Sequence, residues 1–124
     1  MGIAYDGLEN VRSEKNEEQG SRKVYELSED EERLLCSIFI DEKRIRSGKL
    51  YMHQAAALEE LRFGTEYLKN KYPDINIVIQ SFSRSNTAVD FARLIFTAGD
   101  EKKYSVKVSR ENDTFSATDD YMEN

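Results

Sequence analysis

Hydrophobic residues change their spacing at the only proline of the chain, Pro73. Before Pro73, apolar residues recur every three or four positions, as they do on one face of a helix. After Pro73 they alternate every two positions, as they do along a half-buried strand. We therefore expect an α+β domain, in which two N-terminal helices pack on an antiparallel meander of three to four strands.

The first helix is expected to run from about residue 29 to residue 46. Ser28 and Glu31 have the spacing of a capping box, in which each side chain bonds to the backbone N–H of the other residue. Gly48 follows the helix and favours its termination. The apolar stripe between these signals consists of Leu34, Leu35, Ile38, Phe39 and Ile45.

The second helix is expected from about residue 50 to residue 72, where Pro73 stops it. Gly64 lies in the middle of this helix, although glycine costs about 1 kcal/mol relative to alanine there. Its presence predicts that another element approaches the helix closely at this point.

Four strands are expected after Pro73, over residues 75–82, 88–97, 104–108 and 114–118. Their short polar connections indicate a meander. The order of helices and strands resembles cystatin-like and NTF2-like folds. These folds host ligand pockets, enzymes, secretion partners and inhibitors, so the resemblance implies no single function.

Charge divides the chain unevenly. Residues 1–32 hold ten acidic and four basic side chains and so carry the whole net charge of −6, whereas residues 33–124 are neutral. Because residues 1–23 have few apolar side chains, we predict that they form a disordered acidic leader. Residues 24–124 are then predicted to form a single α+β domain. The chain shows no signal peptide and no transmembrane segment, which favours a soluble, cytoplasmic protein.

The sequence offers few residues that could carry out catalysis or bind a metal ion. The chain has one cysteine, Cys36, and one histidine, His53, too few for a zinc site of thiolates and imidazoles. Cys36 is interpreted as a small buried hydrophobic residue. Asp90 lies between Val89 and Phe91, and we interpret it as an edge or turn residue. We therefore predict no catalytic residue, no metal and no cofactor.

Two groups of side chains could bind a partner. Lys43, Arg44, Arg46 and Lys49 form a basic cluster that could contact phosphate or nucleic acid, although cations also gather at helix C-termini for electrostatic reasons. Tyrosine is used seven times, and exposed tyrosines bind proteins well. The expected partner-binding tyrosines are Tyr25, Tyr72 and Tyr121.

The leading hypothesis is a small non-catalytic protein-binding module, such as an inhibitor, an immunity-type protein or an accessory protein. One alternative is a small-ligand-binding or minor enzymatic domain with a pocket between the sheet and a helix. The other alternative is a nucleic-acid-binding protein that uses the basic cluster. The expected partner is another protein rather than nucleic acid or a membrane, and the oligomeric state is left open.

Overall fold

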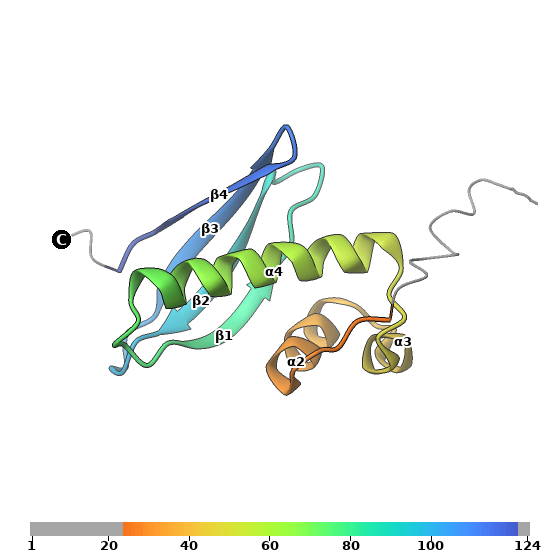
Figure 1. The fold of residues 1–124 in the computed structure, drawn as a ribbon, viewed down its shortest axis with the longest axis horizontal. Coiled ribbons are helices and arrows are strands. Elements are labelled where there is room, and N and C mark those ends of the chain that lie inside the picture. Colours follow the sequence, from red (N-terminus) through yellow and green to blue (C-terminus); the bar gives the residue numbers. More distant parts are fainter. Residues whose placement is uncertain (1–23, 122–124) are drawn as a thin grey trace, which may run out of the picture.

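The computed structural model describes residues 24–121, so the prediction of a disordered leader over residues 1–23 lies outside the described residues. The helices are α2 (Glu29–Ile38), α3 (Glu42–Ser47) and α4 (Met52–Lys71). The strands are β1 (Val78–Ser83), β2 (Phe91–Thr97), β3 (Tyr104–Glu111) and β4 (Thr114–Asp119). The α+β fold class is confirmed: helices that precede the strands pack against an antiparallel sheet (Figure 1).

The sheet is a four-stranded meander in the order β1-β2-β3-β4, and every neighbouring pair is antiparallel. A tight turn joins β3 to β4, with Asn112 at φ 53° and Asp113 at φ 64°. Asn and Asp tolerate this left-handed conformation better than other residues that have a side chain. The two outer strands of the sheet are β1 and β4.

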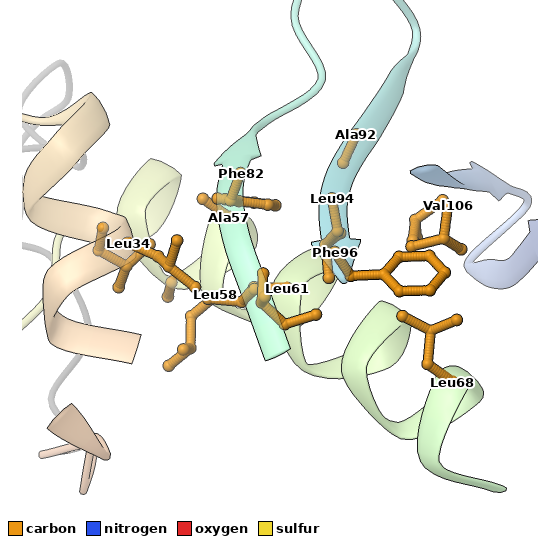
Figure 2. Close-up of a cluster of buried hydrophobic side chains, with 14 of the residues drawn as sticks. Leu34, Ala57, Leu58, Leu61, Leu68, Phe82, Ala92, Leu94, Phe96 and Val106 are labelled. Atoms are coloured by element: carbon orange, nitrogen blue, oxygen red, sulfur yellow. The ribbon is translucent and has the colours of Figure 1, made fainter. Parts of the chain in front are cut away.

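The core lies between the sheet and the helices. Figure 2 shows leucines of α2 and α4 meeting apolar side chains of β1, β2 and β3. Helix α4 approaches the sheet closely at Gly64, because a Cβ atom there would lie 2.9 Å from Leu94 Cδ1 and 3.0 Å from Val108 Cγ2. The predicted close approach at Gly64 is confirmed.

Both predicted ends of the first helical region are confirmed. Ser28 Oγ accepts a hydrogen bond from the Glu31 N–H at 3.1 Å, and Glu31 Oε1 accepts one from the Ser28 N–H at 3.0 Å. Gly48 adopts φ 79°, and its carbonyl accepts a hydrogen bond from the Tyr25 N–H at 2.9 Å. A Cβ at Gly48 would lie 2.2 Å from the Tyr25 carbonyl oxygen, so only glycine fits this position.

The prediction of one continuous helix over residues 29–46 is wrong. The chain becomes extended at Phe39, with φ −124° and ψ 143°, and α3 starts again after Asp41. This break lets α3 turn back against α2, so that Ile45 is fully buried while Ile40 is fully exposed. The apolar spacing from Leu34 to Ile45 suits either arrangement, and no proline or glycine marks the break.

The first strand does not alternate regularly. Strict alternation along residues 75–82 would place Ile79 and Phe82 on opposite faces of the sheet, yet both are buried in the core. The pairing of β1 with β2 shifts between Ile79 and Ser81, which is a β-bulge at Gln80. A bulge adds one residue to one strand and so reverses the alternation of side chains beyond it.

The acidic region does not coincide with the leader. Five of its acids belong to described residues, and four of those lie in the first turn of α2: Glu26, Glu29, Asp30, Glu31 and Glu32. Anionic side chains at this helix end interact favourably with the helix dipole. These five acids therefore belong to the folded domain and not to the predicted leader, residues 1–23.

Candidate functional site

The outer edge of β4 presents backbone hydrogen-bonding groups that no described strand pairs. The Asp120 N–H donates to the Ser105 carbonyl at 3.1 Å, continuing the β3–β4 ladder. Because hydrogen-bonding alternates along an antiparallel strand, Thr114, Ser116 and Thr118 also direct their N–H and C=O groups at β3. The N–H and C=O groups of Phe115 and Ala117 therefore point away from the sheet.

The opposite edge of the sheet is covered. Helix α2 packs against β1, and Arg33 Nη2 donates a hydrogen bond to the Ile79 carbonyl at 3.0 Å. Figure 1 shows α2 near β1 and β4 on the other side of the sheet. Folded proteins commonly cover or charge their sheet edges to prevent unwanted pairing. In the described part of the chain, α2 packs against β1, whereas no described strand pairs with the outer edge of β4.

An open groove of about 1070 Å³ extends over the outer face of α4 to β4. Phe63 of α4 and Phe115 of β4 stack in it, with ring centroids 5.1 Å apart and planes at 28°. The Arg110 guanidinium lies 4.5 Å from the centre of the Phe115 ring and donates to Glu59 at 2.7 Å. Aromatic rings thus lie directly beside the open backbone edge of β4.

A buried carboxylate, that of Asp119, is bound by Tyr67 and Lys71, two residues that line the groove. The side chain of Asp119 is only 1% exposed. Its Oδ1 accepts from the Tyr67 hydroxyl at 2.7 Å and from Lys71 Nζ at 2.7 Å. Its Oδ2 accepts from the Tyr72 hydroxyl at 2.6 Å and from the Tyr121 N–H at 3.1 Å. These bonds fasten the end of β4 to the last turns of α4.

The carboxylates of Asp119 and Glu31 have lowered pKa values, so both stay charged at neutral pH. Burial alone would raise the pKa of Asp119, but hydrogen bonds from Lys71, Tyr72 and Tyr67 lower this pKa to about 2. Burial likewise opposes the effect of Arg62 on Glu31, whose pKa is lowered overall. A general acid at neutral pH needs a raised pKa. Neither carboxylate has the pKa of such an acid.

The basic cluster predicted from residues 43–49 is largely neutralised by neighbouring acids. Arg44 lies 3.5 Å from Asp41, and its guanidinium stacks 3.9 Å from the centre of the Tyr51 ring. Arg46 binds Glu42 at 2.7 Å and Glu32 at 3.0 Å. Only Lys43 and Lys49 in this cluster form no side-chain ion pair with a described residue. Nucleic-acid contact through this cluster stays a prediction without geometric support.

The three predicted partner-binding tyrosines are half-buried, so the expectation that they are exposed is wrong. Tyr25, Tyr72 and Tyr121 all pack against the hydrophobic core. The rings of Tyr72 and Tyr121 meet edge to face with centroids 5.0 Å apart. Tyr121 also contacts Tyr104 at 4.8 Å. The structure does not gather the three tyrosines into one surface, and their binding of a partner stays a prediction.

Sequence reasoning missed two buried acids. Asp119 and Glu60 are each 8% exposed as whole residues. Glu60 accepts hydrogen bonds from the Ser85 N–H at 3.2 Å and from the Ser85 hydroxyl, which ties the β1–β2 loop to α4. Asp90, the acid singled out from the sequence, is exposed before β2. The signal available for Asp119 was its position two residues after Ala117, on the same face of β4.

Cys36 is half-buried beside the core, and burial raises the pKa of its thiol. Within residues 24–121, no cluster of three or more His, Cys, Asp or Glu side chains is placed to hold a metal ion. No helix in that same range is both long and apolar enough to cross a membrane.

A scan against family models finds no match, and comparison of the chain with curated proteins and with solved structures finds none either. The resemblance to cystatin-like and NTF2-like folds therefore stays a prediction about element order. The function must be argued from the geometry of the chain itself.

Proposed function

We propose that this protein is a non-catalytic protein-binding module that takes an extended segment of a protein partner along β4. The observation that carries the proposal is the contrast between the two sheet edges. The β1 edge is covered by α2 and by Arg33, whereas no described residue pairs with the β4 edge. Extended peptides commonly bind to such edges as an added strand.

The groove supplies what an added strand needs besides backbone hydrogen bonds. Successive side chains of a strand point to opposite faces, so every second side chain of the partner would turn toward α4. There it would meet the rings of Phe63 and Phe115 and the half-buried ring of Tyr67. Backbone pairing then provides affinity, and contact with the aromatic rings provides sequence preference.

The test is selection of extended peptides from a displayed library by the immobilised full chain at low density. Ala117→Pro removes the outward N–H of β4 and leaves pairing with β3 intact, because proline is tolerated where the N–H faces away from the sheet. Ala117→Ser keeps the N–H and is the matched control. We expect selected peptides to bind wild type and Ala117→Ser, and to lose at least about tenfold in affinity for Ala117→Pro. Equal binding to all three proteins would refute the proposal.

A second candidate function uses the same groove for a small ligand. The volume of about 1070 Å³ is large enough for one, since ligand sites usually measure about 300–1000 Å³. A small ligand would contact Phe63 and Tyr67 without needing the β4 backbone. Fragment binding that is equal in wild type and in Ala117→Pro would therefore favour this candidate over strand addition.

A further inference from the structure

One face of the sheet packs against the helices, and the other face presents polar side chains. On β2 and β3, the side chains directed at the helices are buried in the core, as Leu94 and Val106 are. Figure 1 shows α4 crossing this side of the sheet. Because side chains alternate along a strand, the residues between the buried ones turn to the opposite side. We call that side the open face.

A row of four polar side chains crosses the middle of the open face, one from each strand. Directly paired residues of antiparallel strands lie on the same face. Arg93 of β2 pairs with Lys107 of β3. Ser83 of β1 pairs with Arg93. Thr118 of β4 pairs with Lys107. All four side chains are exposed, so the row presents a guanidinium and an ammonium group between two hydroxyl groups.

The two cations of this row have no acidic partner. Like charges directly opposite each other destabilise a sheet, and neither Arg93 nor Lys107 forms an ion pair with a described residue. Asp120 lies on the open face, but its carboxylate accepts from the Ser105 N–H at 2.9 Å and from the Ser105 hydroxyl at 3.2 Å. Glu111 lies four residues beyond Lys107 on β3. The middle of the open face therefore carries positive charge that an anionic partner would neutralise.

An aromatic ring lies beside the two cations. Phe91 precedes Arg93 by two residues on β2, so its half-buried ring belongs to the same face. The centre of this ring is 5.5 Å from the Arg93 guanidinium and 4.8 Å from Lys107 Nζ. The two charges thus converge beside one ring. The half-buried side chain of Ile95 extends the apolar surface on the other side of Arg93.

We propose that the open face binds single-stranded nucleic acid. Arg93 and Lys107 bind phosphate groups of the backbone, and the ring of Phe91 stacks against a base. Proteins that bind single strands commonly combine cations that follow the backbone with aromatic rings on which bases stack. An open sheet suits such a strand because its bases can be splayed out, whereas a duplex keeps its bases stacked inside.

This site is separate from the two surfaces considered above. Strand addition at β4 uses the outward backbone groups of Phe115 and Ala117, whereas the open face uses side chains that stand roughly perpendicular to the sheet. The basic cluster predicted from the sequence, residues 43–49, belongs to α3 and the turn after it. Binding at the open face can therefore be tested independently of both.

The first test is the fluorescence anisotropy of a labelled oligo(dT) of about twelve nucleotides, titrated with the full chain at low salt. The double variant Arg93→Gln/Lys107→Gln should raise the dissociation constant at least about tenfold. It should also reduce the slope of log K against log salt by about 1.4, because each phosphate contact to a single strand contributes about 0.7. The matched control, Lys43→Gln/Lys49→Gln, removes the same charge near α3 and should bind like wild type.

Two outcomes of this titration would overturn the proposal. One is that the wild-type chain fails to bind oligo(dT) at low salt. The other is that the Lys43→Gln/Lys49→Gln control loses as much affinity as the double variant of the open face, because binding would then follow net charge or use the basic cluster.

A second variant tests the stacking. Phe91→Leu keeps an apolar side chain and removes the ring, so it should raise the dissociation constant about fivefold to a hundredfold without changing the salt slope. Unlabelled duplex DNA of the same length and poly-glutamate should compete with labelled oligo(dT) more weakly than unlabelled oligo(dT) does. Competition by either one that equals that of the single strand would contradict the assignment to single-stranded nucleic acid.

Loss of folding cannot imitate these results. The double variant removes a contact between like charges on exposed side chains, so its urea midpoint should stay the same or rise. Addition of oligo(dT) should shift the amide NMR signals of Arg93, Lys107 and their neighbours in the row, and shifts confined to residues 43–49 would overturn the proposal. Ala117→Pro should bind oligo(dT) like wild type, so the failure of strand addition and the failure of this site are separate results.

Discussion

Replacing Asp119 with asparagine tests whether a charged carboxylate holds the end of β4 to α4. The substitution keeps the shape of the side chain and removes its negative charge. One of its two oxygens becomes an NH₂ group. If that group takes the place of Oδ2, it faces the Tyr121 N–H, which then loses its acceptor. The variant therefore weakens the bonds to Lys71 and the tyrosines and also leaves a donor without a partner.

The expected magnitude has two parts. The pKa of Asp119 falls from 3.8 to about 2 on folding, which corresponds to about 2 kcal/mol at neutral pH. Because Lys71 is 46% exposed, solvent screens part of this attraction, and we expect between about 1 and 2 kcal/mol. The unpaired donor adds about 1–3 kcal/mol that does not depend on pH. The total loss at pH 7 is therefore about 2–5 kcal/mol.

The two parts separate with pH. A group whose pKa is lowered in the folded state stabilises that state above its unfolded pKa, and this contribution disappears as the pH falls through the folded pKa. The difference in unfolding free energy between wild type and Asp119→Asn should thus shrink between about pH 5 and pH 2. Urea titrations followed by circular dichroism, from pH 7 to the lowest pH at which both proteins still fold, measure this difference.

The matched control is Asp120→Asn. Asp120 is the next residue, is exposed, and accepts from the Ser105 N–H at 2.9 Å. Its loss should cost no more than about 1 kcal/mol. The reasoning is refuted if Asp119→Asn costs as little as this control, or if its effect is as large near pH 3 as at pH 7.

Other expectations can be checked by urea unfolding or by labelling. Gly48→Ala should lower the free energy of unfolding by more than about 2 kcal/mol, because its Cβ would meet the Tyr25 carbonyl oxygen and its φ is left-handed. Gly99→Ala is the control, since Gly99 has φ +89° but open space around it, so its loss of stability measures the conformational part of the cost. Ser28→Ala should cost about 0.5–2 kcal/mol, and an unchanged midpoint would argue against the cap. Cys36 should react with iodoacetamide more slowly than a free thiol until the protein is unfolded, and rapid native labelling would contradict its placement. Removal of residues 1–23 should shift the thermal midpoint by only a few degrees, and loss of cooperative unfolding would show that these residues are needed.

The spacing of apolar residues predicted the fold correctly where one face of a helix or strand packs against the core. Leu58, Leu61 and Leu68 of α4 lie on one helix face and are all buried, and Val106 and Val108 of β3 alternate with exposed residues. Such spacing is a direct consequence of burying one face. The glycine in α4 was equally informative, because only a close neighbour makes a glycine useful in a helix interior.

The spacing of apolar residues misled the prediction at the break between α2 and α3 and at the bulge in β1, because no proline or glycine marks either place. Asp41 is a preferred N-cap residue, but an aspartate on a solvated helix face has the same appearance in sequence. The bulge at Gln80 leaves no compositional sign at all. The candidate site escaped prediction for a different reason: Asp119 and its donors are up to 52 residues apart, so their meeting depends on how α4 lies over β4.

Arg33 limits how far any assembly built on this sheet can grow. A sheet that is open at both edges can add copies without end, as fibrils do. Here the Arg33 guanidinium donates a hydrogen bond to the Ile79 carbonyl on the β1 edge, and α2 packs against the same strand. Whatever strand joins β4, the enlarged sheet ends on covered β1 edges or on the edge of the guest. Through this sheet each chain can therefore accept an added strand on the β4 side only.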